Sequence, residues 1–236
     1  MPVTLPAKDL GRRMLHDFAN ARYKWLTVAL ISSMLLAPIT KEFAYGVRVI
    51  DGLLLFVIVA TLRASYRSRA RFLVMIVAAA LTGALLVVHA LVPRLWLAVA
   101  FHLPLLYLLA TVTALILLDI LSTTRVTVDT IAGAICVYML IGFVFAIVFS
   151  LCATLVPDAF LHVSGSKVLM HFHSGGFGNS VYFSFATLTT VGYGDVAPRA
   201  EIVRSLAVLE AMAGQLYLTI LVARLVGMHI SVLAKD

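Results

Sequence analysis

A run of nine residues, Thr187–Asp195, contains the residue types most able to do chemistry, in the order Thr-Leu-Thr-Thr-Val-Gly-Tyr-Gly-Asp. To aim several backbone carbonyl oxygens at one axis, a chain must alternate between right- and left-handed conformations, and glycine adopts the left-handed one at little steric cost. Gly192 and Gly194 are separated by one residue, and the hydroxyl of Thr190 precedes them. This spacing suits a ladder of oxygens that can replace the water around a bare cation. One chain supplies one wall of such a tube, so the sequence predicts a symmetric homotetramer.

The residues before this run predict a short helix that ends at it. The apolar stretch Val181–Leu188 is too short to span a bilayer, three glycines in residues 175–178 interrupt the chain before it, and Asn179 or Ser180 can cap a helix start. A helix over about 180–189 would be ~15 Å long, or half the bilayer. Since lipid cannot satisfy its ends, we expect a re-entrant segment buried against protein. The negative end of its dipole would favour a cation near the loop.

The composition indicates what kind of protein holds these elements. The chain has 236 residues and a net charge of +7, and 62% of its residues are hydrophobic. Only 12% are charged, against about 25% in soluble domains. These values exclude a soluble enzyme, a disordered chain and a disulfide scaffold, and they predict an all-α, polytopic membrane protein. Six apolar runs predict six transmembrane helices, at roughly 23–40, 45–62, 72–92, 95–118, 130–156 and 202–228.

Basic residues in the loops predict the orientation of these spans. The N-terminal segment and the loops on its side of the membrane would hold ten lysines and arginines, against four on the other side. Both termini are therefore predicted to be cytoplasmic, which leaves the stretch 157–201 outside. We expect a multi-pass protein of the plasma membrane, or of the inner membrane if the source is bacterial, with no cleavable signal peptide.

The run Thr187–Asp195 resembles the selectivity filter of the potassium channel family, and residues 196–198 continue the match. The resemblance covers roughly residues 130–228 and implies a pore domain made of an outer helix, a pore helix, the filter and an inner helix. The domains expected around it are a cytoplasmic segment at 1–22, a four-helix membrane domain with a voltage-sensor layout at 23–120, and a short cytoplasmic tail at 229–236.

The family resemblance also implies roles for single residues. K⁺ would be the permeant ion, and no cofactor is implied. The ion sites would lie at the carbonyls of five consecutive residues, with the outermost shaping the mouth: Thr190, Val191, Gly192, Tyr193 and Gly194. Support from behind would come from Thr187, Thr189 and Asp195. Voltage-gated relatives often carry two tryptophans where this chain has Tyr182 and Phe183, so the hydrogen bonds that brace the filter are expected to differ.

Two residues of the inner span are gating candidates. Gly214 lies sixteen residues after Pro198, where the family places its hinge glycine, and both bending and close helix packing are open there. Glu210 lies one turn earlier in an apolar stretch, where a carboxylate must be paired, hydrated or protonated. Thr187 and Thr189 could donate to it. Cation attraction, proton sensing and a structural hydrogen bond are its alternative roles.

The other polar residues of the inner span give no prediction of a role in gating. Arg224 is expected to extend toward lipid headgroups. Gln215, Tyr217 and Thr219 are ordinary polar residues of an inner helix, and no specific role is assigned to them.

The four leading spans raise the question of voltage sensing, which needs several arginines at three-residue spacing in a membrane helix. The fourth span, 95–118, contains no arginine or lysine, so weak or no intrinsic voltage dependence is predicted. The eight residues after Met228 are too few for a ligand-binding module, which leaves pH, lipid, tension, constitutive conduction or a separate regulatory subunit. An anchor on anionic lipid is expected at Arg63, Arg67, Arg69 and Arg71.

Two alternatives belong to other functional classes. The first is a weakly selective cation channel or the membrane subunit of a cation uptake system. The second is an integral membrane enzyme that uses His89, His102 and Asp119, which lie far apart along separate spans without metal-ligand spacing. We therefore expect neither an enzyme nor a nucleic-acid partner.

Overall fold

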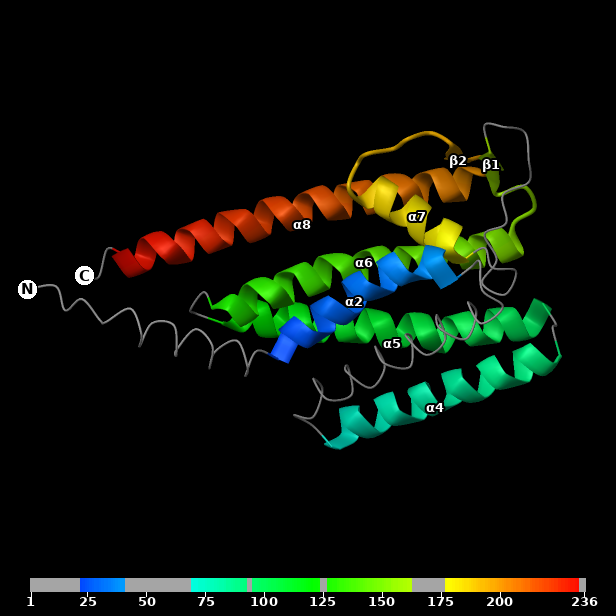
Figure 1. The fold of residues 1–236 in the computed structure, drawn as a ribbon, viewed down its shortest axis with the longest axis horizontal. Coiled ribbons are helices and arrows are strands. Elements are labelled where there is room, and N and C mark those ends of the chain that lie inside the picture. Colours follow the sequence, from blue (N-terminus) through cyan, green and yellow to red (C-terminus); the bar gives the residue numbers. More distant parts are fainter. Residues whose placement is uncertain (1–21, 41–68, 93–94, 124–126, 163–176, 234–236) are drawn as a thin grey trace, which may run out of the picture.

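A computed structural model describes residues 22–40, 69–92, 95–123, 127–162 and 177–233 of the chain. Six helices account for most of these residues (Figure 1). They are α2 (Arg22–Thr40), α4 (Arg69–Leu91), α5 (Leu95–Ser122), α6 (Val128–Leu155), α7 (Phe177–Leu188) and α8 (Glu201–Leu233). Two short strands are β1 (Phe160–His162) and β2 (Val196–Pro198).

Helix α6 lies at the centre of the packing. Helices α2, α5, α7 and α8 all contact it, and α4 packs on the far side of α5 (Figure 1). Its 28 residues are apolar around most of the circumference, and a helix of this kind is stable only when neighbours cover it. Thr127 defines its start, because its side chain accepts a hydrogen bond from the backbone N–H of Thr130 in a capping box.

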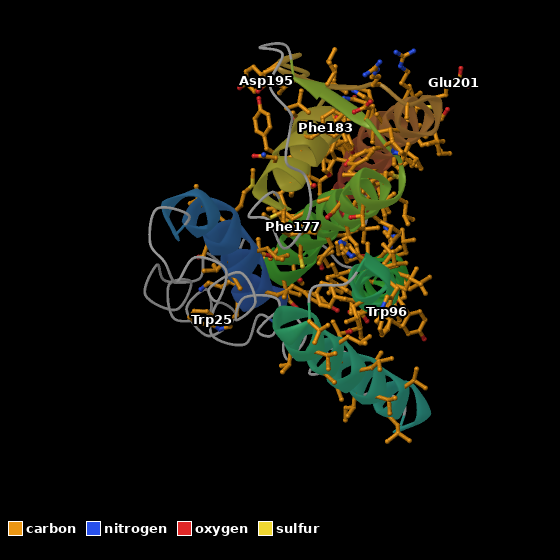
Figure 2. The ribbon with its side chains drawn as sticks, turned by 90° about the vertical axis from the view of Figure 1, so that its right-hand side faces the viewer. Trp25, Trp96, Phe177, Phe183, Asp195 and Glu201 are labelled. Atoms are coloured by element: carbon orange, nitrogen blue, oxygen red, sulfur yellow. The ribbon has the colours of Figure 1, made fainter. Side chains whose placement is uncertain are left out.

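Three stretches of the described helices are long and apolar enough to cross a membrane: Val99–Ser122, Val128–Leu155 and Glu201–Arg224. Large apolar side chains, Trp25 and Trp96 among them, point outward (Figure 2). These features support a helical membrane protein. The six predicted spans are not confirmed: 23–40 and 72–92 form α2 and α4, which are not among the three, and 45–62 lies outside the described residues.

Strands β1 and β2 are elements that an all-α prediction did not include. They pair antiparallel, with Leu161 opposite Ala197, and the N–H of Arg199 donates to the carbonyl of Ala159. The chain leaving the loop 189–195 needs partners for its backbone polar groups, and the segment after α6 provides them. The pairing therefore fixes the outer end of the loop to the end of α6.

Two helix ends differ from the sequence prediction. Helix α7 begins at Phe177, so Asn179 and Ser180 lie inside it and neither is the predicted cap at its start. Phe177 is buried in the main core, which explains why the helix extends to include it. At the other end of the chain, α8 continues to Leu233, through most of the predicted tail.

Candidate functional site

Helix α7 lies between α6 and α8 (Figure 1), and aromatic side chains pack it against α6 and β1. The ring of Phe183 packs edge-on against Phe149 and Phe160, with centroids 4.9 Å and 5.2 Å away. Phe185 also meets Phe143 of α6 edge-on, at 5.5 Å. The helix has 12 residues and is therefore about 18 Å long, too short to cross a bilayer. It is the half-length helix expected before the loop.

The loop after α7 has an alternating backbone. Positive φ angles occur at every second residue: 57° at Thr190, 52° at Gly192 and 79° at Gly194. The loop stays close to the end of α7, since the N–H of Thr190 donates to Thr187 and that of Gly192 donates to Ala186. Alternation of this kind is what a ladder of carbonyl oxygens requires. Thr190 adopts a left-handed conformation without being glycine, which the glycine spacing did not predict.

The outer part of the loop is braced by a tyrosine. The rings of Tyr182 and Tyr193 stack at 6.2 Å, and the hydroxyl of Tyr182 donates to Oδ1 of Asp195 at 3.0 Å. An ordinary tyrosine hydroxyl is protonated at neutral pH, so it can act as the donor here. Phe183 turns inward instead (Figure 2). The brace thus uses Tyr182, one of the two positions at which a tryptophan was expected from the resemblance to voltage-gated channels.

A glutamine and a tyrosine hold the inner end of the loop. Nε2 of Gln215 on α8 donates to Oγ1 of Thr190 at 3.2 Å. The hydroxyl of Tyr138 on α6 donates to the carbonyl of Leu188, the last residue of α7, at 3.3 Å. Sequence reasoning gave no role to Gln215. The position of Gln215 in the middle of a predicted membrane span was the available signal, because a polar side chain there needs a protein or water partner.

A second tyrosine, also without a predicted role, joins α8 to α6. The hydroxyl of Tyr217 donates to the carbonyl of Ala134 at 2.7 Å. Its ring stacks on that of Tyr138 at 6.0 Å. The two tyrosines thus link α6, α7 and α8 just below the loop.

Glu210 is fully buried where these three helices meet. Its Oε1 lies 2.5 Å from Oγ of Ser184 on α7, and that Oγ lies 2.6 Å from the carbonyl oxygen of Gly142 on α6. The expectation that Thr187 or Thr189 donates to Glu210 is not met by the contacts observed: Ser184 is the partner, and the hydroxyl of Thr189 bonds to its own helix at the Phe185 carbonyl. No role was predicted for Ser184.

The reason for this partner is the register between α7 and α8. Leu188 contacts α8 at Gly214, and residues one turn earlier on both helices are Ser184 and Glu210. Residues four apart share a helix face, so these two pairs stack along one contact line. Thr189 lies beyond the end of α7 at Leu188.

Gly214 is a point of very close approach. A Cβ placed there would overlap the carbonyl oxygen of Leu188 and lie 2.9 Å from its Cδ1. Close packing, one of the two roles left open for this glycine, is therefore present in the structure. Bending of α8 at Gly214 stays a prediction.

Arg224 contacts protein at the other end of α8. Its Nη2 donates to the carbonyls of Leu121 and Thr123, at 2.7 Å and 2.9 Å. These carbonyls lie at the C-terminal end of α5, where the helix dipole favours a cation. The expectation that Arg224 extends to lipid is replaced by this contact, which joins α8 to the fourth predicted span.

The other predicted candidates do not form a common site. Nε2 of His102 lies 3.1 Å from Oγ of Ser150, and Asp119 accepts a hydrogen bond from the hydroxyl of Tyr23. Within the described ranges, no three His, Cys, Asp or Glu side chains are grouped so that they could hold a metal ion. The side chain of His89 and those of the predicted lipid anchor lie outside what the structure describes: Arg63, Arg67, Arg69 and Arg71.

Comparison with known proteins bears on this same region. Residues 150–230 match the model of a family described as "Ion channel". No curated protein and no solved structure matches the chain. The matched residues run from the end of α6 through α7 and the loop into α8, and so include the loop and Glu210. The match and the apolar helices together support an ion-channel domain within a membrane protein.

Proposed function

We propose that the chain conducts K⁺ passively across the plasma membrane through a homotetrameric pore. The observation that carries this proposal is the alternating backbone at Thr190, Gly192 and Gly194, directly after a half-length helix. Successive carbonyls of such a backbone can face one axis and replace the hydration shell of a dehydrated cation. The run Thr190–Tyr193 would provide the ion sites, with the Gly194 carbonyl at the mouth.

The surface of a single chain supports the tetramer. Residues 191–195 are exposed, although a selectivity filter must be enclosed. Helix α8 also has exposed large apolar side chains beside the loop, including Val208, Leu209 and Met212. A contiguous apolar surface of this kind indicates a partner or lipid. Four copies around one axis would enclose the loop and bury part of this surface.

The distribution of charged residues supports the proposal that the pore has little intrinsic voltage dependence. Helix α5 contains no arginine or lysine, so it lacks the gating charges that a moving sensor helix needs. We therefore propose a pore whose opening is set by something other than voltage, with cytoplasmic termini, and we expect no enzymatic activity.

Ion flux into liposomes that contain the purified protein tests the proposal. We expect Rb⁺ and K⁺ to enter far faster than Na⁺, and native mass spectrometry to give the mass of four chains. Flux that does not distinguish K⁺ from Na⁺ would favour a weakly selective cation channel. The membrane subunit of a cation uptake system would also fit such unselective flux, whereas no flux at all would leave the integral membrane enzyme as the remaining alternative.

The variant Gly192→Ala tests the ladder itself. Gly192 has a φ of 52°, a conformation that costs an L-residue about 1–2 kcal/mol. With that cost at each of four positions around the pore, we expect selective flux to fall to background. Gly83→Ala is the matched control, because Gly83 lies in α4 and a Cβ there meets nothing within 4 Å. Unchanged flux in Gly192→Ala would contradict the ladder.

A further inference from the structure

Two contacts of Ser184 compete for one proton. Its Oγ lies 2.6 Å from the carbonyl oxygen of Gly142 and 2.5 Å from Oε1 of Glu210. A serine hydroxyl donates a single hydrogen and accepts through two lone pairs. A carbonyl oxygen can only accept, so the serine proton must point to Gly142 if that contact is a hydrogen bond. The contact to Glu210 is then a hydrogen bond only if the carboxyl group carries the proton.

The surroundings of Glu210 also disfavour a charged carboxylate. Among the described residues, its buried Oε2 has no hydrogen-bond partner and its carboxyl group makes no ion pair. On α6 the titratable group that faces it is Tyr138, whose hydroxyl is engaged with Leu188. On α7, the hydroxyl of Tyr182 is engaged with Asp195. An unpaired buried charge is unfavourable, and a neutral acid with one free oxygen is much less so.

We propose that Glu210 is a positioning residue held as a neutral carboxylic acid, which donates to Ser184 while Ser184 donates to Gly142. The chain of hydrogen bonds then runs in one direction from α8 through α7 to α6. It fixes the position of α7 along the axes of its two neighbours, one helical turn before the contact of Leu188 with Gly214. This role deepens the proposed function, since α7 carries the loop.

Removal of the proton would break the chain at a defined point. A carboxylate at Oε1 would compete with the Gly142 carbonyl for the serine proton, so one of the two contacts would become a repulsion between lone pairs. Either α7 separates from α6 or α8 separates from α7. We therefore expect conduction to require the protonated form.

Infrared spectroscopy of the purified protein in lipid tests the protonation directly. We expect the C=O stretching band of a protonated carboxylic acid at neutral pH, and its loss in Glu210→Gln. Glu201→Gln is the matched control, because Glu201 is an exposed carboxyl in the first turn of the same helix, and it should leave the band unchanged. A parent protein without the band, or a band that persists in Glu210→Gln, would overturn the proposal.

Flux measurements separate positioning from mere packing. Glu210→Gln keeps a neutral donor for Ser184, so its K⁺ flux should stay within about twofold of the parent. In Glu210→Ala and Ser184→Ala a buried donor or acceptor loses its partner, so the K⁺ flux should fall about tenfold or more. Ser205→Ala is the control for the serine, since Ser205 is exposed and bonds within α8. Equal flux in Glu210→Ala and Glu210→Gln would contradict the role. A parent that shows the band but conducts no ion would contradict the proposed function instead.

Discussion

Helix α8 has an outer half and an inner half that are held in different ways. The outer half meets α7 and α6 through a buried carboxyl, Glu210, and a glycine, Gly214, with no space for a side chain. In the inner half, most of the described side chains between residues 218 and 227 are exposed, and Arg224 donates to carbonyls at the end of α5. The two polar residues are about four turns apart along the helix.

The difference shows how burial decides which polar group can serve as an anchor. Inside packed helices an ion is costly, so an acid there is favourable only when it is neutral or paired. At the end of a helix the free carbonyls supply partial negative charge, and a guanidinium can satisfy two of them at once. The buried contact of Glu210 with Ser184 is the outer anchor, and the partly exposed contact of Arg224 with the end of α5 is the inner anchor.

The largest effect should come from filling the close approach at Gly214. Gly214→Ala would push α8 away from Leu188, and overpacking of this kind costs about 1–3 kcal/mol. We expect a lower unfolding midpoint of the purified protein and strongly reduced K⁺ flux. Gly227→Ala is the matched control in the inner half, because a Cβ there meets nothing within 4 Å. If the two variants behave alike, the halves of α8 do not differ as described.

Loss of the inner anchor should have a smaller effect. Arg224→Gln would remove a charged donor from the carbonyls of Leu121 and Thr123, which should cost about 1–2 kcal/mol, reduced from the buried value by partial exposure. We expect a modest loss of stability, measured by denaturant unfolding, and a change in open probability with selectivity unchanged. Arg224→Lys should lie between parent and glutamine variant, since one ammonium binds two carbonyls less well. Altered selectivity would show that the inner anchor acts on the filter after all.

The smallest effect should come from a single hydroxyl between the two anchors. Tyr217→Phe would remove the hydrogen bond to the carbonyl of Ala134, which is worth about 1 kcal/mol. A small decrease in the unfolding midpoint is expected, with flux close to that of the parent. Tyr107→Phe, on the exposed side of α5, should change neither quantity. A loss of flux as large as that of Gly214→Ala would show that Tyr217, about one turn further along α8, belongs to the outer anchor.

Much of the site could be predicted from the residues alone. The loop, its two left-handed glycines and the half-length helix before it follow from spacing and length, because each depends on the chain close by. The left-handed Thr190, the start of α7 at Phe177 and the strand pair beside the loop could not be predicted in this way. Each depends on a contact with a distant segment.

Apolar length and glycine spacing are properties of a local stretch, so the residues alone predict a helical membrane protein with a half-length helix and a loop able to face a cation. Three pairs of contacts become known from the folded chain: Ser184 and not a threonine meets Glu210, Gln215 reaches Thr190, and Arg224 binds α5. Those pairs depend on the register of one helix against another. That register is set by how whole faces interlock, with Gly214 against Leu188 as the closest point, and no local pattern contains it.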